Sequence, residues 1–119
     1  MKRVAIVVSL LVCAAAAIAL PQGFSLIKEF LTGYEEVPAL STPGNGEFRA
    51  KISNDESRIV WELSYADLES AVQQAHLHIG NVSVNGGISV FLCTNLGNGP
   101  AGIQPCPPAP ATISGVIEA

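Results

Sequence analysis

The feature that most constrains this chain is a pair of short segments in which apolar and polar residues alternate one by one. Residues 47–52 and residues 59–65 both follow this pattern, and the turn-forming residues 53–57 separate them. A period of two places every second side chain on the same face of a β-strand. The pattern predicts an antiparallel hairpin with a half-buried inner face. That face holds the predicted core: Phe48, Ala50, Ile52, Ile59, Trp61 and Leu63.

Four weaker strand signals surround this hairpin. They lie at residues 25–31, 73–79, 88–93 and 112–117, with turns rich in Gly, Pro and Asn between them. Residues 80–87 suit a hairpin loop, residues 66–70 fit either a short helical turn or a loop, and Pro38 favours extended backbone over residues 35–38. No convincing helical period is present. Six short strands predict an all-β antiparallel sandwich or barrel, with the last strand at an unpaired edge.

The first nineteen residues have the order of a secretory signal peptide. Lys2 and Arg3 precede an apolar run, and small residues then lead to Ala17 and Ala19. We expect cleavage after Ala19, which leaves residues 20–119 as one β domain that is secreted to the extracellular space or the periplasm. The alternative is an uncleaved anchor, but the apolar run is shorter than the roughly 18 to 20 residues of a membrane-spanning helix.

The charge balance excludes some partners. The chain has ten acidic and six basic residues, and two of the basic ones, Lys2 and Arg3, belong to the predicted signal peptide. The remaining four basic residues form no patch in the sequence. An acidic surface repels phosphate groups, so we expect neither nucleic acid nor, after signal cleavage, a membrane as a partner.

Two cysteines remain after removal of Cys13 with the signal peptide. Cys93 and Cys106 are the only pair available, and an oxidising compartment favours a disulfide between them. A bridge over a loop of this length stabilises by about 3 kcal/mol in the chain-entropy model. The alternative is two free thiols.

The segment Ala75-His76-Leu77-His78 is the candidate site. On a strand, His76 and His78 point to the same face, and this spacing lets both rings approach one metal ion, copper or zinc. A catalytic zinc needs three protein ligands, so further donors would come from carboxylates such as Glu35, Glu36 or Asp67, or from another chain. In the alternative interpretation, both histidines are hydrogen-bonded to backbone or to a carboxylate and fix the strand in place.

No arrangement of residues predicts catalysis. The serines lack the G-x-S-x-G setting of a hydrolase nucleophile. Glu35 and Glu36 are adjacent, so on an extended segment only one of them faces inward. General acid and base catalysis requires two groups that converge on one pocket, and the sequence does not indicate such a pair.

Several motifs in this order together resemble the chordin-type (CHRD) domain. The resemblance covers most of the chain after the signal peptide. Its most specific part is a Leu-x-Gly-x-x-Glu-Val-Pro motif followed by Ala-His-Leu-His. The residues that carry these motifs are Leu31, Gly33, Glu36, Val37, Pro38, Ala75, His76 and His78.

The resemblance implies an immunoglobulin-like antiparallel sandwich in a secreted protein without established enzymatic activity. In chordin, such repeats accompany extracellular regulation of growth-factor signalling. The family pattern continues through a Tyr-x-Asn-x-His-Thr motif and a closing Gly-Glu-Ile-Arg-Gly strand, and both are missing here. The resemblance therefore implies a sandwich that is incomplete at its C-terminal side, so a site that combined His76 and His78 with the later histidine would also be incomplete.

These observations predict a secreted, non-catalytic binding or structural module whose partner is a protein or a surface ligand. The rival hypothesis is a metal-binding protein that uses His76 and His78 and takes part in redox chemistry. A third interpretation is a truncated gene product that folds poorly, and a cooperative unfolding transition would exclude it.

Overall fold

The predicted hairpin is the centre of a four-stranded antiparallel sheet. The computed structural model describes residues 23–81, 83, 84 and 86–118, so the predicted signal peptide lies outside it. Strand β2 (Asn45–Ile52) pairs with β3 (Arg58–Ala66), and Ala50 lies opposite Trp61. Strand β1 (Ser25–Thr32) pairs with β2, and β6 (Ala111–Glu118) pairs with β3. The strand order is β1-β2-β3-β6, which places β1 and β6 at the two edges.

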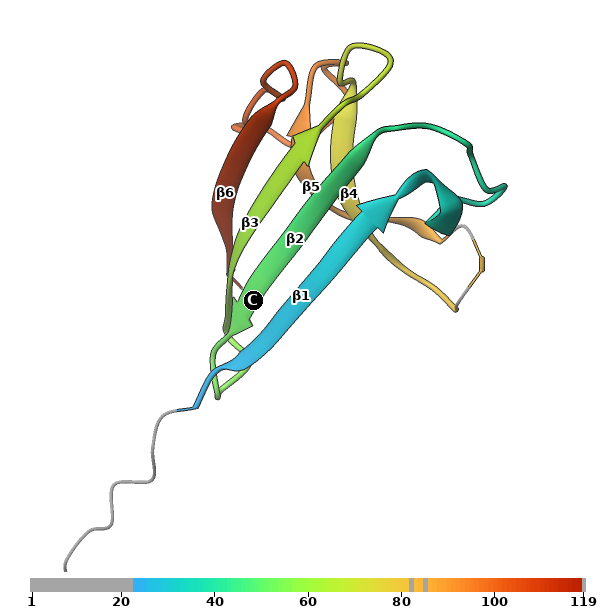
Figure 1. Ribbon diagram of the computed structural model, residues 1–119. Coiled ribbons are helices and arrows are strands. Elements are labelled where there is room, and N and C mark those ends of the chain that lie inside the picture. Colours follow the sequence, from blue (N-terminus) through green and yellow to red (C-terminus); the bar gives the residue numbers. More distant parts are fainter. Residues whose placement is uncertain (1–22, 82, 85, 119) are drawn as a thin grey trace, which may run out of the picture.

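A second, two-stranded sheet completes the sandwich. Strand β4 (Gln74–Ile79) pairs with β5 (Gly87–Thr94), and Figure 1 shows this pair behind the larger sheet. All six predicted strands are present, and all pairings are antiparallel. The structure therefore confirms an all-β antiparallel sandwich. The prediction that the last strand lies at an edge is also confirmed, because β3 is the only strand of the described residues that pairs with β6.

The core lies between β5 and the inner face of β2, β3 and β6. Its buried members come from both sheets and from the segment before β6: Ala50, Trp61, Leu63, Tyr65, Leu92, Cys93, Cys106 and Ile113. Phe48 and Ile59 pack against this cluster and are partly buried. Five of the six predicted inner-face residues thus form the core or pack against it, whereas Ile52, at the end of β2, is half-buried and is not part of this cluster. All residues of β1 are exposed, so the core does not extend to that edge.

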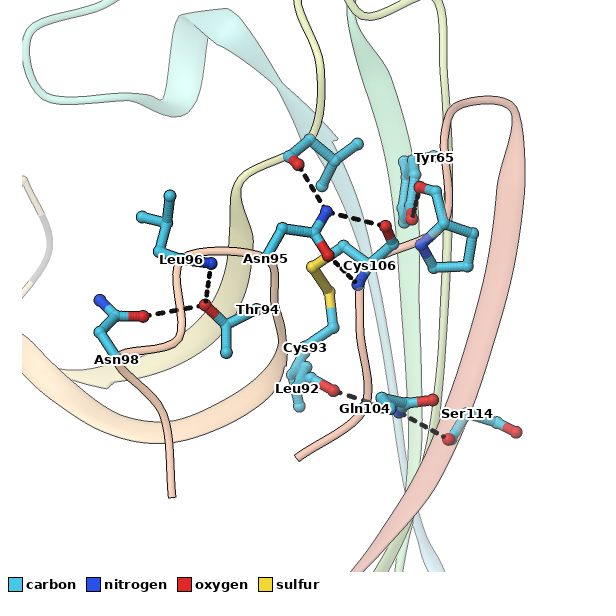
Figure 2. The surroundings of a disulfide bond; sticks show 12 residues. Tyr65, Leu92, Cys93, Thr94, Asn95, Leu96, Asn98, Gln104, Cys106 and Ser114 are labelled. Atoms are coloured by element: carbon cyan, nitrogen blue, oxygen red, sulfur yellow. Dashed lines mark hydrogen bonds between the residues drawn. A yellow bond between two sulfur atoms is a disulfide. The ribbon is translucent and has the colours of Figure 1, made fainter. Parts of the chain in front are cut away.

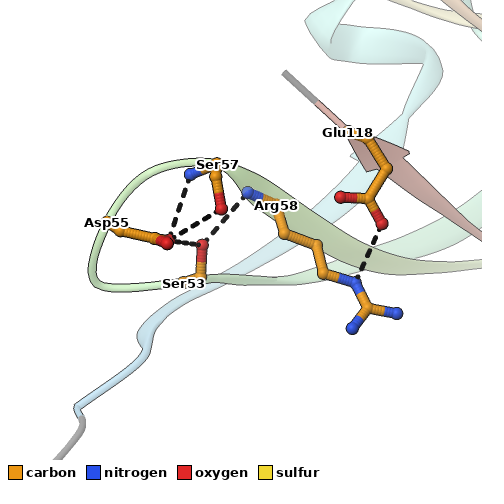
Figure 3. A network of polar contacts seen from close by, with 5 residues as sticks. All are labelled: Ser53, Asp55, Ser57, Arg58 and Glu118. Carbon is orange, nitrogen blue, oxygen red and sulfur yellow. Dashed lines mark hydrogen bonds and ion pairs between the residues drawn. The ribbon is translucent and has the colours of Figure 1, made fainter.

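A serine-rich turn joins β2 to β3 (Figure 3). Asp55 Oδ1 accepts hydrogen bonds from Ser53 Oγ at 2.6 Å and from Ser57 Oγ at 2.9 Å, and Ser53 Oγ accepts one from the Arg58 backbone N–H at 3.0 Å. These bonds lower the pKa of Asp55, with Ser53 the largest cause and Ser57 the next. The turn therefore supports the central hairpin through an ionised carboxylate.

Residues 35–38 differ in part from the prediction of extended backbone. Glu35 ends a 3₁₀ helix, η1 (Gly33–Glu35), whereas Glu36 is extended with φ −72° and ψ 156°. The Gly33 carbonyl accepts backbone hydrogen bonds from Glu36 at 3.3 Å and Leu40 at 2.7 Å, and these bonds close the turn. Gly33 is buried, and a Cβ there would lie 2.6 Å from the Leu40 oxygen. The close approach requires glycine, because any larger residue would clash with backbone.

The remaining connections are loops. Residues 67–73 form no helix, so a loop, and not a helical turn, follows β3. Residues 80–86 connect β4 to β5 as predicted, and within this loop Ser83 has a positive φ of 62°. No helix in the described part of the chain is long and apolar enough to span a membrane.

Candidate functional site

Strand β4 presents the two histidines on the side of the small sheet that faces away from the core. Ala75 and Leu77 are partly buried and pack against the core. His76 and His78 alternate with them, so their side chains project to the opposite face. The two ring centroids lie 4.5 Å apart with perpendicular planes. The predicted common direction of the two imidazoles is therefore present.

An irregularity in the pairing with β5 precedes each of the two histidines. The register with β5 shifts between Ala75 and His76 and again between Leu77 and His78. Each shift leaves one extra residue on β5, which is the definition of a β-bulge, and bulges redirect side chains next to functional sites. The ring of Phe91, on β5, meets the His76 ring edge to face at a centroid distance of 5.9 Å.

His78 is exposed but held by the backbone. Its Nδ1 lies 2.7 Å from the Gly86 carbonyl oxygen. A carbonyl can only accept a hydrogen bond, so Nδ1 carries the proton. In the neutral ring, Nε2 then has the free lone pair. This contact agrees with a structural role for His78, and it also fixes the tautomer that a metal ligand needs.

His76 is partly buried, and its pKa lies below the ordinary value. Burial is the largest cause, and the charge of His78 acts in the same direction. A backbone hydrogen bond and the negative charge of Glu36 oppose this shift. Both main causes favour the uncharged ring of His76, which is the form that binds metals.

The three candidate carboxylates, Glu35, Glu36 and Asp67, differ in their surroundings. Glu36 acts electrostatically on His76. Glu35 belongs to η1, and Asp67 accepts a hydrogen bond from Asn45 Nδ2 at 3.0 Å. Within the described residues, no group of three or more His, Cys, Asp or Glu side chains is arranged to hold a metal ion. The pair of histidines therefore has a nearby charge but no third ligand from these residues.

The disulfide ties β5 to the segment before β6. Cys93 and Cys106 are bonded, and both are buried. Sequence reasoning missed two polar residues beside this bridge, Asn95 and Gln104 (Figure 2). Gln104 Nε2 donates to the carbonyl oxygens of Leu92 and Ser114, both at 3.1 Å. It thereby links β5 of one sheet to β6 of the other. The position of Asn95 just after a strand was the available signal, because Asn side chains often bond nearby backbone.

The other motif residues lie around the connection that follows β1. Leu31 is exposed, Gly33 is buried, and the peptide bond between Val37 and Pro38 is cis. Glu36, in this segment, acts electrostatically on His76. The motif therefore has a structural role in the turn that Gly33 closes with Leu40.

A shallow hollow of about 570 Å³ lies at the end of the larger sheet. Its lining includes the aromatic ring of Phe30 and the polar side chains of Asn45, Glu47, Ser64 and Thr112. Neither histidine of β4 lines it. The hollow is open, and its mixture of aromatic and hydrogen-bonding groups suits surface contacts.

The fold and these sites define a small, disulfide-bonded antiparallel β-sandwich with an exposed edge strand. The model of the CHRD domain matches residues 28–111. The chain therefore belongs to the CHRD domain family, as the motifs in its sequence predicted. Comparisons with curated proteins and with solved structures found no match.

Proposed function

We propose that this domain acts outside the cytoplasm as a non-catalytic binding module. Membership of the CHRD domain family supports a role as a module. The disulfide supports an oxidising compartment, because such bonds are rare in the cytosol. The predicted signal peptide at residues 1–19 agrees with export, and the partner is a protein or another surface ligand.

The main support for this proposal is the exposure of the edge strand β1. All eight of its residues are exposed, and Leu26 and Phe30 are 73% and 66% exposed. Leu26 pairs with Lys51, and Phe30 pairs with Glu47. Both apolar side chains therefore lie on the outer face of the sheet. An edge strand also has unpaired backbone groups that accept a further strand. Apolar side chains beside such an edge favour a partner that adds an extended segment.

The charges of β1 select against a second copy of this chain. Lys28 and Glu29 lie in the middle of the strand. In a two-fold pair of β1 strands, the two central registers place Lys28 opposite Lys28 or Glu29 opposite Glu29. Like charges directly opposite each other are destabilising. We therefore expect the partner strand to come from a different protein.

Lys28 combines charged and aromatic groups on the outer face of β1. Its Nζ lies 3.2 Å from Glu47 Oε2 and 4.8 Å from the centroid of the Phe30 ring. The lysine thus covers one side of the aromatic ring while the hollow lies beside it. A partner that docks here would meet an aromatic surface with charged groups at its border, which is a common composition of protein interfaces.

The test compares two variants in the exporting host. Leu26→Lys with Phe30→Lys changes the outer face of β1, and Val116→Lys changes the outer face of the opposite edge strand as a matched control. These positions are exposed, so each change should alter stability by only about 0.5 kcal/mol. We expect quantitative crosslinking to identify a partner bound by the wild type and the control but lost from the β1 variant.

A second measurement checks the mode of binding. On addition of the purified partner, the outward backbone amides of β1 should exchange hydrogen more slowly, whereas those of β6 should not change. Identical crosslinking by the wild type and the β1 variant would contradict the proposal, and so would protection confined to other strands.

A further inference from the structure

The pair of histidines on β4 is a second surface feature of this fold, on a different sheet from β1. The ring centroids are 4.5 Å apart, and both rings lie on the face away from the core. The register with β5 shifts immediately before His76 and again immediately before His78. A regular hairpin has no such shifts in register. The irregular backbone of β5 opposite His76 and His78 is therefore a specific feature of this part of the small sheet.

The hydrogen bond of His78 supports a ligand role. In metal sites, a histidine usually donates one ring N–H to a carbonyl or a carboxylate, and this contact sets the tautomer and orientation of the ring. His78 Nδ1 makes this contact with Gly86 O at 2.7 Å. Its Nε2 is then available for coordination, and the exposure of His78 leaves that side open to solvent.

The nature of the ion follows from the number and type of donors. Two imidazoles are too few for a structural or catalytic zinc site. For nitrogen donors, Cu²⁺ binds most strongly of the divalent first-row ions, and it accepts a tetragonal arrangement in which water fills the other positions. The carboxylate of Glu36 adds a negative charge that acts on His76.

We propose that His76 and His78 form a two-histidine site that binds one Cu²⁺ ion per chain, with water completing the coordination. Glu36 assists through its charge. The site captures copper at the surface of the module and binds Zn²⁺ more weakly. No redox step is part of this proposal.

The chain itself makes the experiment selective, because it contains only two histidines. Protein exported without an affinity tag is titrated with Cu²⁺ and with Zn²⁺ by calorimetry, and the copper complex is measured by electron paramagnetic resonance. We expect one Cu²⁺ per chain with hyperfine coupling from two imidazole nitrogens, and a lower affinity for Zn²⁺. His78→Gln should lower copper affinity by at least about tenfold, since even outer-shell partners of ligands are worth roughly 10 to 100-fold.

Matched variants decide the remaining points. His76→Gln together with His78→Gln should abolish binding. His78 is exposed, so His78→Gln alone tests the site even if the double variant folds poorly. Glu36→Gln should lower the affinity for Cu²⁺. Glu62 is an exposed carboxylate on the larger sheet, and Glu62→Gln should leave that affinity unchanged. Unchanged binding in the His78 variant would overturn the proposal, as would the absence of saturable binding in the wild type.

Discussion

Asn95 pairs with both backbone groups of Cys106. Its Nδ2 donates to the Cys106 carbonyl at 2.9 Å, and its Oδ1 accepts from the Cys106 backbone N–H at 3.0 Å. The same Nδ2 also donates to the Val72 carbonyl at 2.9 Å. One side chain thus joins three segments beside the disulfide: the residue after β5, the segment before β6, and the loop before β4 (Figure 2).

Replacement of Asn95 should destabilise the fold. Asn95→Asp keeps the oxygen that accepts from Cys106 but removes both N–H donors, which leaves the carbonyls of Val72 and Cys106 without this partner. We expect a loss of about 1 to 3 kcal/mol, because two hydrogen bonds to backbone carbonyls are removed. Urea unfolding with the disulfide intact measures the change. Asn54→Asp, in the exposed turn between β2 and β3, is the control, and an equal effect in both variants would contradict the role of Asn95.

The disulfide should make a contribution of similar size. The bridge joins residues thirteen positions apart, and Cys93 is fully buried. Replacement of both cysteines with Ala should lower the free energy of unfolding by about 3 kcal/mol. Thiol titration of the exported protein under denaturing, non-reducing conditions should detect no free thiol. Two titratable thiols would show that the bridge does not form in the exported protein.

Gly115 should be essential for the packing of Trp61. A Cβ at this position would lie 2.6 Å from Trp61 Cζ2 and 2.8 Å from Cε2. Gly115→Ala should therefore displace the indole and cost about 1 to 3 kcal/mol, as overpacked cores do. Gly87→Ala is the matched control, since a Cβ there meets nothing within 4 Å.

The single tryptophan makes this prediction easy to follow. Fluorescence of Trp61 should shift toward longer wavelength in Gly115→Ala and remain unchanged in Gly87→Ala, while urea unfolding reports the stability of each. A Gly115→Ala protein with wild-type stability and emission would show that the core can adjust without cost.

The β2–β3 turn should make stability depend on pH in the acidic range. The pKa of Asp55 in the folded protein lies below its ordinary value of 3.8, because Ser53 and Ser57 donate hydrogen bonds to the carboxylate. The stabilisation is present above that value and is lost as the pH falls through the lower pKa of the folded state. The melting temperature of the wild type should therefore decline below about pH 4.

Asp55→Asn isolates this effect. The variant should already be less stable at neutral pH and should show a smaller decline in melting temperature below pH 4. Part of the decline should remain, because the pKa of Glu47 is also lowered, mainly by its hydrogen bond with Arg49. Parallel melting curves of the variant and the wild type across this range would contradict a role for Asp55.

Local patterns in the sequence were sufficient to predict the strands. Alternation in residues 47–52 and 59–65 depends only on the two-residue period of the β-strand, so the inner face with Trp61 could be identified before the structure was known. The turn around Gly33 could not be predicted in the same way. It depends on the approach of Leu40 to the glycine backbone, and Pro38 alone suggested extended backbone at Glu35.

The sequence by itself determined the all-β class, the pairing of two neighbouring strands and the family, because these depend on short-range periodicity and on motifs. Only the tertiary structure decided which elements meet across long loops. The bulges in β5 opposite β4, the electrostatic effect of Glu36 on His76 and the bonds from Asn95 and Gln104 all involve segments that are distant in the sequence. Such contacts depend on how the two sheets pack and on the loops that close between them, and no local pattern encodes that geometry.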